Sequence, residues 1–145
     1  MNGLEILKTI VNDGSGCKYF GGLMSIDRLN LKPSSRVFYI CNTDFWVGKG
    51  KHWVVMNFLE EEKTVEFFDP IGNPPDISFI KFMKKYRKEI VYNKFRVQPL
   101  NSNKCGEYCI FFASFRSKEV KFEKLLSYMQ EEKNVLSYVN DLITS

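Results

Sequence analysis

Four residues that together can carry out acyl transfer occur in order along the chain: His52, Asp69, Gln98 and Cys105. A thiol attacks a carbonyl carbon once an imidazole takes its proton, a carboxylate orients that imidazole, and an amide N–H stabilises the oxyanion. His52 is the only histidine in the chain, so the base can be no other histidine. The residue types therefore predict thiol-based catalysis, with His52 as base and Cys105 as nucleophile.

Two neighbouring strands are expected to bring His52 and Asp69 together. Residues 52–59 and 64–69 are mostly apolar and predict two strands of a hairpin. A two-residue loop of Glu60 and Glu61 sets a register in which His52 faces Asp69, and directly opposed Cβ atoms lie about 4.5–5.5 Å apart. A three-residue loop shifts the register by one and removes the match. The alternative is that Asp69-Pro70 only ends the strand.

The residues around Cys105 predict the start of a helix that runs to Arg116. Residues 101–103 (Asn-Ser-Asn) supply candidate caps, and Gly106 allows close approach. The positive end of a helix and a nearby imidazolium lower the pKa of a thiol from its usual value of about 8.5. Cys109 lies one turn further on, among apolar residues, and is expected to be an inert core thiol. The alternative for Cys105 is a buried structural cysteine.

Gln98 ends a short strand predicted over residues 95–98, on the way to the Cys105 helix. Its amide can donate to an oxyanion together with the Cys105 backbone N–H. An exposed glutamine at a strand end is the alternative. Trp53, beside His52, either shields the imidazole or belongs to the core.

The remaining elements predict an α+β fold in which helices flank a central mixed sheet. The chain of 145 residues, with 44% hydrophobic and 15% aromatic residues, is expected to form one domain over residues 1–145. A glycine-rich loop over Gly14–Gly22 either lines a substrate groove or is a simple turn. One further strand, over residues 36–42, and four further helices are predicted, over residues 3–12, 76–90, 122–129 and 135–143.

Charge and cysteine usage narrow the classes of protein. A net charge of +4 permits contact with nucleic acid without requiring it. The four cysteines lack metal-ligand spacing, and the chain shows no secretion signal and no apolar run as long as a membrane span. We therefore expect free thiols in a reducing compartment, no metal and no membrane. Four lysines on one side of the predicted helix 76–90 either bind phosphate or form a solvated face (Lys81, Lys84, Lys85 and Lys88).

In the types and order of these residues, the chain resembles adenain, the adenovirus-type maturation endopeptidase, and more distantly the ubiquitin-like-protein-specific proteases. The resemblance covers most of residues 4–115 and includes the segments KHWVVMNF, KTVEFFDPIG and VQPLNSNKCGEYCIFF. It implies a papain-related layout with the nucleophile at a helix N-terminus, and it assigns base, acid, oxyanion donor and nucleophile to His52, Asp69, Gln98 and Cys105. It also implies cleavage of viral structural precursor proteins near glycine, in the virion and the infected host cell.

The chain departs from the adenain pattern in its acid, its length and its cysteines. The acid is Asp69 where adenain-type enzymes usually carry Glu, and only residues 117–145 follow the catalytic helix. Adenovirus enzymes are stimulated by DNA and by a viral peptide bound through a disulfide. Residues 86–96 contain no cysteine for such a bond, although non-covalent strand addition stays open. No cofactor is required by the sequence, and DNA stimulation through the Lys81–Lys88 face is left open.

The sequence thus predicts a viral cysteine endopeptidase of virion precursor proteins. Two alternatives use the same residues differently. One is a protease that removes ubiquitin or a ubiquitin-like modifier, whose substrates also end in glycine. The other is a non-catalytic, nucleic-acid-associated virion protein that uses the lysine face.

Overall fold

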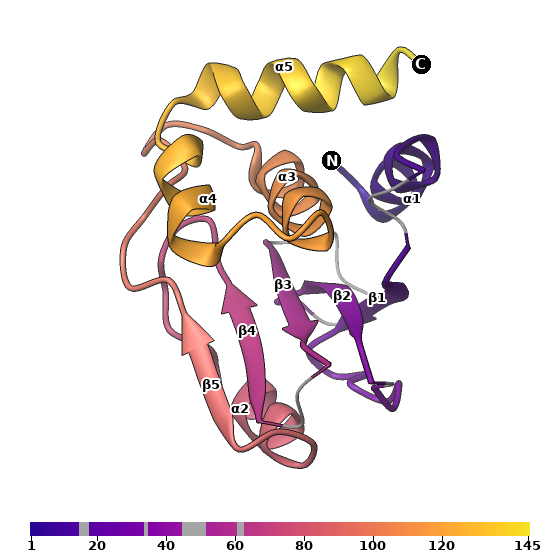
Figure 1. The fold of residues 1–145 in the computed structure, drawn as a ribbon, viewed down its shortest axis with the longest axis vertical. Coiled ribbons are helices and arrows are strands. Elements are labelled where there is room, and N and C mark those ends of the chain that lie inside the picture. The colour runs from indigo at the N-terminus through magenta and orange to yellow at the C-terminus, as the bar shows by residue number, and fades with distance from the viewer. Residues whose placement is uncertain (15–17, 34, 45–51, 61–62) are drawn as a thin grey trace.

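A five-stranded mixed sheet forms the centre of the protein (Figure 1). The computed structural model describes residues 1–14, 18–33, 35–44, 52–60 and 63–145. The strands lie in sequence order, β1-β2-β3-β4-β5, with parallel pairs at the two edges and antiparallel pairs in the middle. Their bounds are Phe20–Ser25 (β1), Val37–Asn42 (β2), Trp53–Phe58 (β3), Thr64–Phe68 (β4) and Glu89–Tyr92 (β5).

Helices cover both faces of this sheet. Helix α2 lies on one face, and the other four helices lie on the opposite face (Figure 1). Every residue of β2 and β3 is buried because these central strands have apolar neighbours on both sides. The bounds of the helices are Gly3–Asn12 (α1), Ile77–Lys84 (α2), Cys105–Ser117 (α3), Phe122–Met129 (α4) and Glu132–Ile143 (α5). This arrangement confirms the predicted α+β fold with a helix starting at Cys105.

Helix α3 is buried almost all round. All nine residues from Gly106 to Ser114 are buried, because the sheet lies on one side of the helix and α1, α4 and α5 pack around it. Its sequence has no polar stripe, as expected for a helix enclosed by protein. A helix held on all sides can fix the position of its first residue, Cys105.

The predicted helix over residues 76–90 is wrong in its second half. Helix α2 ends at Lys84, and residues 89–92 form the edge strand β5 instead. Beyond the helix, the buried guanidinium of Arg87 donates to the carbonyl oxygens of Tyr86, Ser35 and Leu59. Ile90 then pairs with Val65 of β4 and packs against the core on the α2 side. The apolar spacing fits helix and strand alike, and pairing with β4 decides between them.

Two other sequence-based assignments change. Residues 95–98, predicted as a strand, form an irregular segment. Within the predicted loop Gly14–Gly22, residues 20–22 belong to β1, where a register shift between Phe20 and Gly22 marks an irregularity. Gly21 lies so close to β2 that an added Cβ would come within 2.4 Å of Val37, so a glycine is needed there. Residues 15–17 of that loop lie outside the described residues.

No helix in the described part of the chain combines the length and apolar character needed to cross a membrane.

Candidate active site

His52 and Asp69 are in direct contact at the end of the sheet where β3 begins and β4 ends (Figure 1). His52 Nε2 and Asp69 Oδ1 are 2.6 Å apart, and Asp69 Oδ1 also accepts a hydrogen bond of 2.9 Å from the Ile71 backbone N–H. The side chains of His52 and Asp69 are only 16% and 5% exposed. A short hydrogen bond with little solvent around it restricts rotation of the imidazole. Since Nε2 is occupied, Nδ1 is the ring nitrogen left for a thiol.

The observed pairing of β3 with β4 differs from the predicted hairpin register. Val55 pairs with Phe68 and Phe58 with Val65, which is a shift of two residues from the predicted register. Continued by one pair, this register places Asp69 opposite Val54, diagonal to His52. A shift of two keeps both side chains on the same face, and diagonal neighbours remain within reach of long side chains. His52 and Asp69 therefore meet although the predicted loop was too short. Residues 61–62 of that loop lie outside the described residues.

Cys105 is the first residue of α3 and is partly exposed. Its thiol lies beside the His52 side chain and the Trp53 backbone, close enough for both to lower its pKa. Among the described residues, no side chain caps this helix: Ser102 Oγ accepts from the Lys104 N–H, just before the helix begins. The first backbone N–H groups of α3 are thus left without a side-chain acceptor, and such groups can bind a negative charge.

The pKa values of Cys105 and His52 are shifted in opposite directions. Burial alone lowers the pKa of His52, but hydrogen bonds and charges from Asp69 and Cys105 outweigh it and raise this pKa from 6.5 to about 9. Burial raises the pKa of Cys105, but hydrogen bonds from His52 and Trp53 and the charge of His52 outweigh it and lower this pKa. These shifts favour a thiolate beside an imidazolium, which is the reactive form of such a pair.

Gln98 lies in the irregular segment before α3 and is 4% exposed. Its Nε2 donates a hydrogen bond of 2.8 Å to the carbonyl oxygen of Ser102, which fixes the plane of the amide. One N–H of the amide remains for another acceptor, and the buried Oε1 has no hydrogen-bond partner among the described residues. Gln98 is thereby attached to the turn that leads into Cys105. Its role as oxyanion donor stays a prediction.

Trp53 belongs chiefly to the core, which was one of its two predicted alternatives. It is 7% exposed and packs in the cluster between the sheet and α3. Its indole Nε1 donates a hydrogen bond of 2.9 Å to the Met1 carbonyl oxygen. Its backbone, through the contact with the Cys105 sulfur, takes part in the site itself.

Two contacts that sequence reasoning missed hold α3 against β4. Arg116 forms two hydrogen bonds with the buried Glu66 carboxylate, at 2.8 and 2.9 Å. Phe112 stacks on Phe68, with ring centroids 4.4 Å apart. Because Phe68 precedes Asp69, these contacts fix the distance between the helix of Cys105 and the strand of Asp69. A glutamate between apolar residues in β4 was the available signal, since a buried carboxylate needs a partner.

The other described cysteines are unsuited to nucleophilic attack. Cys41 and Cys109 are fully buried free thiols, and burial is the main cause that raises the pKa of each. Cys17 lies outside the described residues. Within the described ranges, no group of three or more His, Cys, Asp or Glu side chains is arranged to hold a metal ion.

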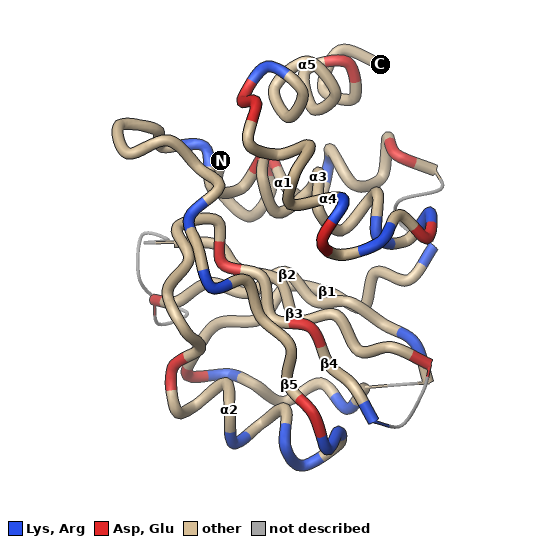
Figure 2. The backbone as a smooth tube through the Cα atoms, turned by 60° about the vertical axis from the view of Figure 1, so that its left-hand side comes forward, with Lys and Arg blue, Asp and Glu red and all other residues tan. Residues whose placement is uncertain are grey.

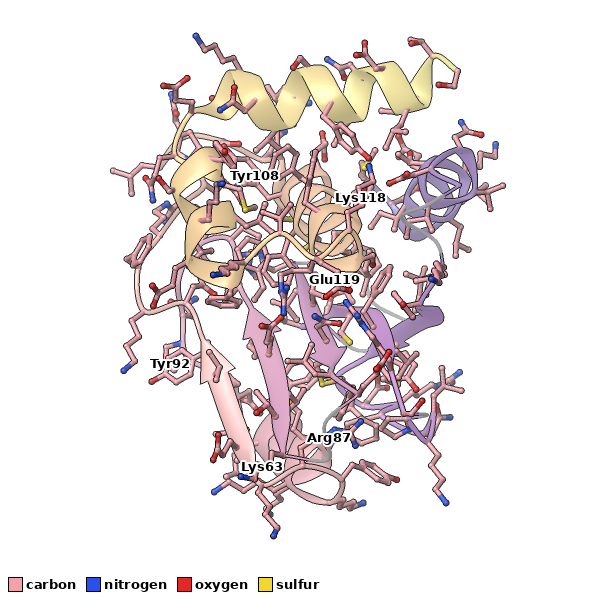
Figure 3. The ribbon with its side chains drawn as sticks, viewed as in Figure 1. Lys63, Arg87, Tyr92, Tyr108, Lys118 and Glu119 are labelled. Carbon is pink, nitrogen blue, oxygen red and sulfur yellow. The ribbon has the colours of Figure 1, made fainter. Side chains whose placement is uncertain are left out.

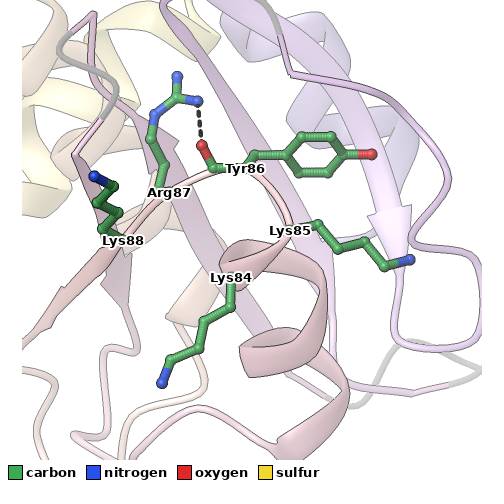
Figure 4. Close-up of a pocket in the computed structure, with 5 residues that line it drawn as sticks. All are labelled: Lys84, Lys85, Tyr86, Arg87 and Lys88. Atoms are coloured by element: carbon green, nitrogen blue, oxygen red, sulfur yellow. Dashed lines mark hydrogen bonds between the residues drawn. The ribbon is translucent and has the colours of Figure 1, made fainter.

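The predicted lysine face lies away from this site. Basic residues gather around α2 and the chain that follows it, on the side of the sheet opposite α3 (Figure 2). Arg87 and Lys63 mark the end of the sheet remote from α3 and α4 (Figure 3). Lys84, Lys85 and Lys88 are exposed and point in different directions (Figure 4). They line one pocket, but their ammonium groups do not converge in it, and lysines at the end of α2 also complement its helix dipole. DNA binding here stays a prediction.

The chain is similar in sequence to proteases of African swine fever virus. It is 24% identical over 119 residues to a curated cysteine protease of that virus, a match that covers 74% of this chain and 43% of the relative. A second curated sequence from the same virus, 26% identical over 66% of this chain and 39% of its own length, is named a SUMO-1 cysteine protease. The chain thus spans less than half the length of these relatives. No protein-family model matches it.

Solved structures share the fold. The crystal structure of the African swine fever virus protease matches 77% of this chain and 44% of its own, with a TM-score of 0.59 and 22% identity. A structure of the SUMO protease Ulp1, with its catalytic cysteine oxidized to a sulfonic acid, matches 98% of this chain and 79% of its own, with a TM-score of 0.52 and 12% identity. Both curated relatives are named cysteine proteases, which is the enzyme class that the sequence predicts.

Proposed function

We propose that this chain is a viral cysteine protease that cleaves after the C-terminal glycine of a ubiquitin-like modifier. The observation that carries the proposal is the pair of Asp69 and His52, joined by a hydrogen bond of 2.6 Å, beside Cys105 at the uncapped start of α3. A ubiquitin-like modifier, predicted as an alternative substrate, now becomes the preferred one. The name of the SUMO-1 cysteine protease among the relatives supports a ubiquitin-like modifier over virion precursors, which the resemblance to adenain implied.

The proposed reaction begins with attack of the Cys105 thiolate on the carbonyl carbon of the scissile bond. Asp69 holds the His52 imidazole through the 2.6 Å hydrogen bond, and the imidazolium gives its proton to the leaving amine. The Cys105 N–H and the second amide N–H of Gln98 stabilise the oxyanion. His52 then takes a proton from water, which attacks the thioester, and Cys105 leaves as a thiolate to restore the starting state.

Two fluorogenic reporters test this assignment: SUMO-1 and ubiquitin, each carrying a fluorophore on its C-terminal glycine. We expect the protein to release the fluorophore from at least one of them, and Cys105→Ala to release none. Cys109→Ala is the matched control, because it removes a thiol from the same helix and should leave turnover intact. Release that persists in Cys105→Ala would refute the mechanism.

Processing of virion precursor proteins is the second candidate, and the viral source of the matched proteases favours it. The same preparations should therefore also be incubated with candidate precursor proteins that contain glycine-rich junctions. If only these precursors are cleaved, and Cys105 is required, the enzyme class stands but the modifier substrate is wrong.

A further inference from the structure

The side chain of Asn93 forms hydrogen bonds with both the main-chain N–H and the main-chain carbonyl of Asp69. Asn93 Oδ1 accepts a hydrogen bond of 3.0 Å from the Asp69 N–H, and Asn93 Nδ2 donates one of 2.6 Å to the Asp69 carbonyl oxygen. Asn93 is 2% exposed, and it directly follows β5, whose last residue, Tyr92, is marked in Figure 3. The side-chain amide therefore acts on Asp69 as a peptide group of a neighbouring strand would.

This contact extends the sheet where the backbone of β5 turns away. Backbone pairing between β4 and β5 runs from Thr64–Glu89 to Phe67–Tyr92. Asp69 is 4% exposed, so without Asn93 its main-chain N–H would be buried with no partner, and its carbonyl oxygen would keep only the hydrogen bond of 2.9 Å from the Gly72 N–H. The Asn93 amide satisfies both groups, since it carries one acceptor and two donors. An aspartate, serine or alanine cannot do so in the same geometry.

The same side chain organises the segment that leads to Gln98. Asn93 Nδ2 also donates to the Phe95 carbonyl oxygen, at 3.1 Å. Beyond it, the backbone N–H groups of Val97 and Gln98 both donate to the Pro70 carbonyl oxygen, at 3.0 Å. Asn93 thus lies where the turn after Asp69 and the segment before α3 are joined.

A close approach at Gly72 strengthens this junction. Gly72 has φ +79°, and a Cβ there would lie 2.6 Å from the Phe95 carbonyl carbon. Only glycine accommodates both the backbone conformation and the contact. The turn after Asp69 and the segment that Asn93 holds are therefore packed backbone against backbone.

We propose that Asn93 is a positioning residue for the acid and for the oxyanion donor of the proposed protease. It fixes the main chain of Asp69, and so the direction of the carboxylate that holds His52. It also fixes the turn through which Gln98 is attached to Pro70. The inference rests on the proposed function, because it assigns Asn93 a part in the same reaction without contact to substrate.

The test compares Asn93→Ala and Asn93→Asp with Asn57→Ala. Asn93→Asp keeps the size and an acceptor oxygen but loses both donors and places a carboxylate against the Asp69 carbonyl oxygen. Asn57 is the matched control: it is also buried, bonds to Glu66 through its amide, and lies at the end of β3 remote from His52. In Asn57→Ala, Glu66 keeps both hydrogen bonds to Arg116, so the contact between α3 and β4 is retained. All three should lose stability, but only the Asn93 variants should lose catalytic geometry.

Two readouts separate positioning from stability. For the reporter that the wild type cleaves, we expect kcat of both Asn93 variants to fall by about 10- to 100-fold with KM nearly unchanged, because misplaced catalytic groups act on the chemical step. His52 is the only histidine, so NMR of histidine-labelled protein reports its titration alone. Its titration midpoint should drop in the Asn93 variants and stay at the wild-type value in Asn57→Ala.

Folded Asn93 variants with the wild-type kcat and His52 midpoint would overturn the inference. Failure of both Asn93 variants to fold while Asn57→Ala folds would overturn it as well, because Asn93 would then serve stability alone. Failure of the proposed function gives a different pattern: the wild type itself would cleave no substrate in a Cys105-dependent way.

Discussion

Cys105 and Cys109 are the same residue type one turn apart on α3, and their surroundings give them opposite properties. Cys105 is partly exposed at the uncapped start of the helix, where contacts with His52 and Trp53 lower its pKa. Cys109 is fully buried in the core, where burial and the nearby charges of Cys105 and Asp69 raise its pKa. One helical turn thus separates a thiol with a lowered pKa from one with a raised pKa, because the pKa depends on neighbouring groups and on solvent.

Serine substitutions at the two positions should give the largest contrast. Cys105→Ser should lower kcat/KM by about 10⁴-fold or more, because loss of the nucleophile disables the whole set of catalytic groups. Cys109→Ser should keep most activity but lower the free energy of unfolding by about 1–3 kcal/mol, because its hydroxyl is buried without an assured partner. Reporter cleavage and urea unfolding measure the two effects. Equal loss of activity in both variants would remove the distinction between the two thiols.

Asp69→Asn tests the acid that supports Cys105 through His52. An amide keeps the shape of the carboxylate but removes the charge that raises the pKa of His52, so we expect kcat/KM to fall by about 10²–10⁴-fold. The rate of Cys105 alkylation at mildly acidic pH should fall with it, while Cys109 stays unreactive. A variant with wild-type kinetics would show that Asp69 only ends its strand.

Gln98→Ala should have a smaller effect, because the Cys105 N–H remains as an oxyanion donor. We expect kcat to fall by about 10²–10³-fold. The alkylation rate of Cys105 should stay near that of the wild type, since the variant leaves the thiol and imidazole in place. Steady-state kinetics combined with alkylation distinguish this result from a general loss of structure, in which both rates would fall.

The smallest expected effect is the difference in pH dependence between the two thiols. The thiolate–imidazolium pair persists from the lowered pKa of Cys105 up to the pKa of His52, about 9, so kcat/KM should decline above that pH. At about pH 6, iodoacetamide should modify Cys105 about tenfold faster than an unstructured peptide thiol. Mass spectrometry of the native protein should find Cys109 unmodified until urea is added. Alkylation of Cys105 with the pH dependence of the free peptide would contradict an activated pair.

The protonated state of His52 also links this site to stability. The pKa of His52 is raised in the folded protein, from 6.5 to about 9, so the stability that it contributes is complete below about pH 6.5. That contribution is lost as the pH rises through 9. Loss of activity above pH 9 should therefore accompany a decline of this part of the unfolding free energy.

Local patterns predicted most of the elements that carry the site. Helix α1 has the predicted bounds, β2, β3 and β4 differ from the predicted strands by at most one residue at either end, and α3 starts at Cys105 as expected. Apolar runs and a glycine beside the thiol were sufficient for this. The end of α2 and the strand β5 could not be predicted, because they depend on pairing with β4, far away in the sequence.

Which chemical groups are available, and in what order, can be taken from the sequence alone, as can the strands beside His52 and Asp69 and the helix that begins at Cys105. The folded arrangement shows in addition that His52 and Asp69 meet diagonally across the ends of β3 and β4, and that Asn93, 24 residues from Asp69, completes the main-chain hydrogen bonds of Asp69. The periodicity of apolar residues encodes which face of a helix or strand is buried. Register and long-range hydrogen bonds depend on how separate elements pack together.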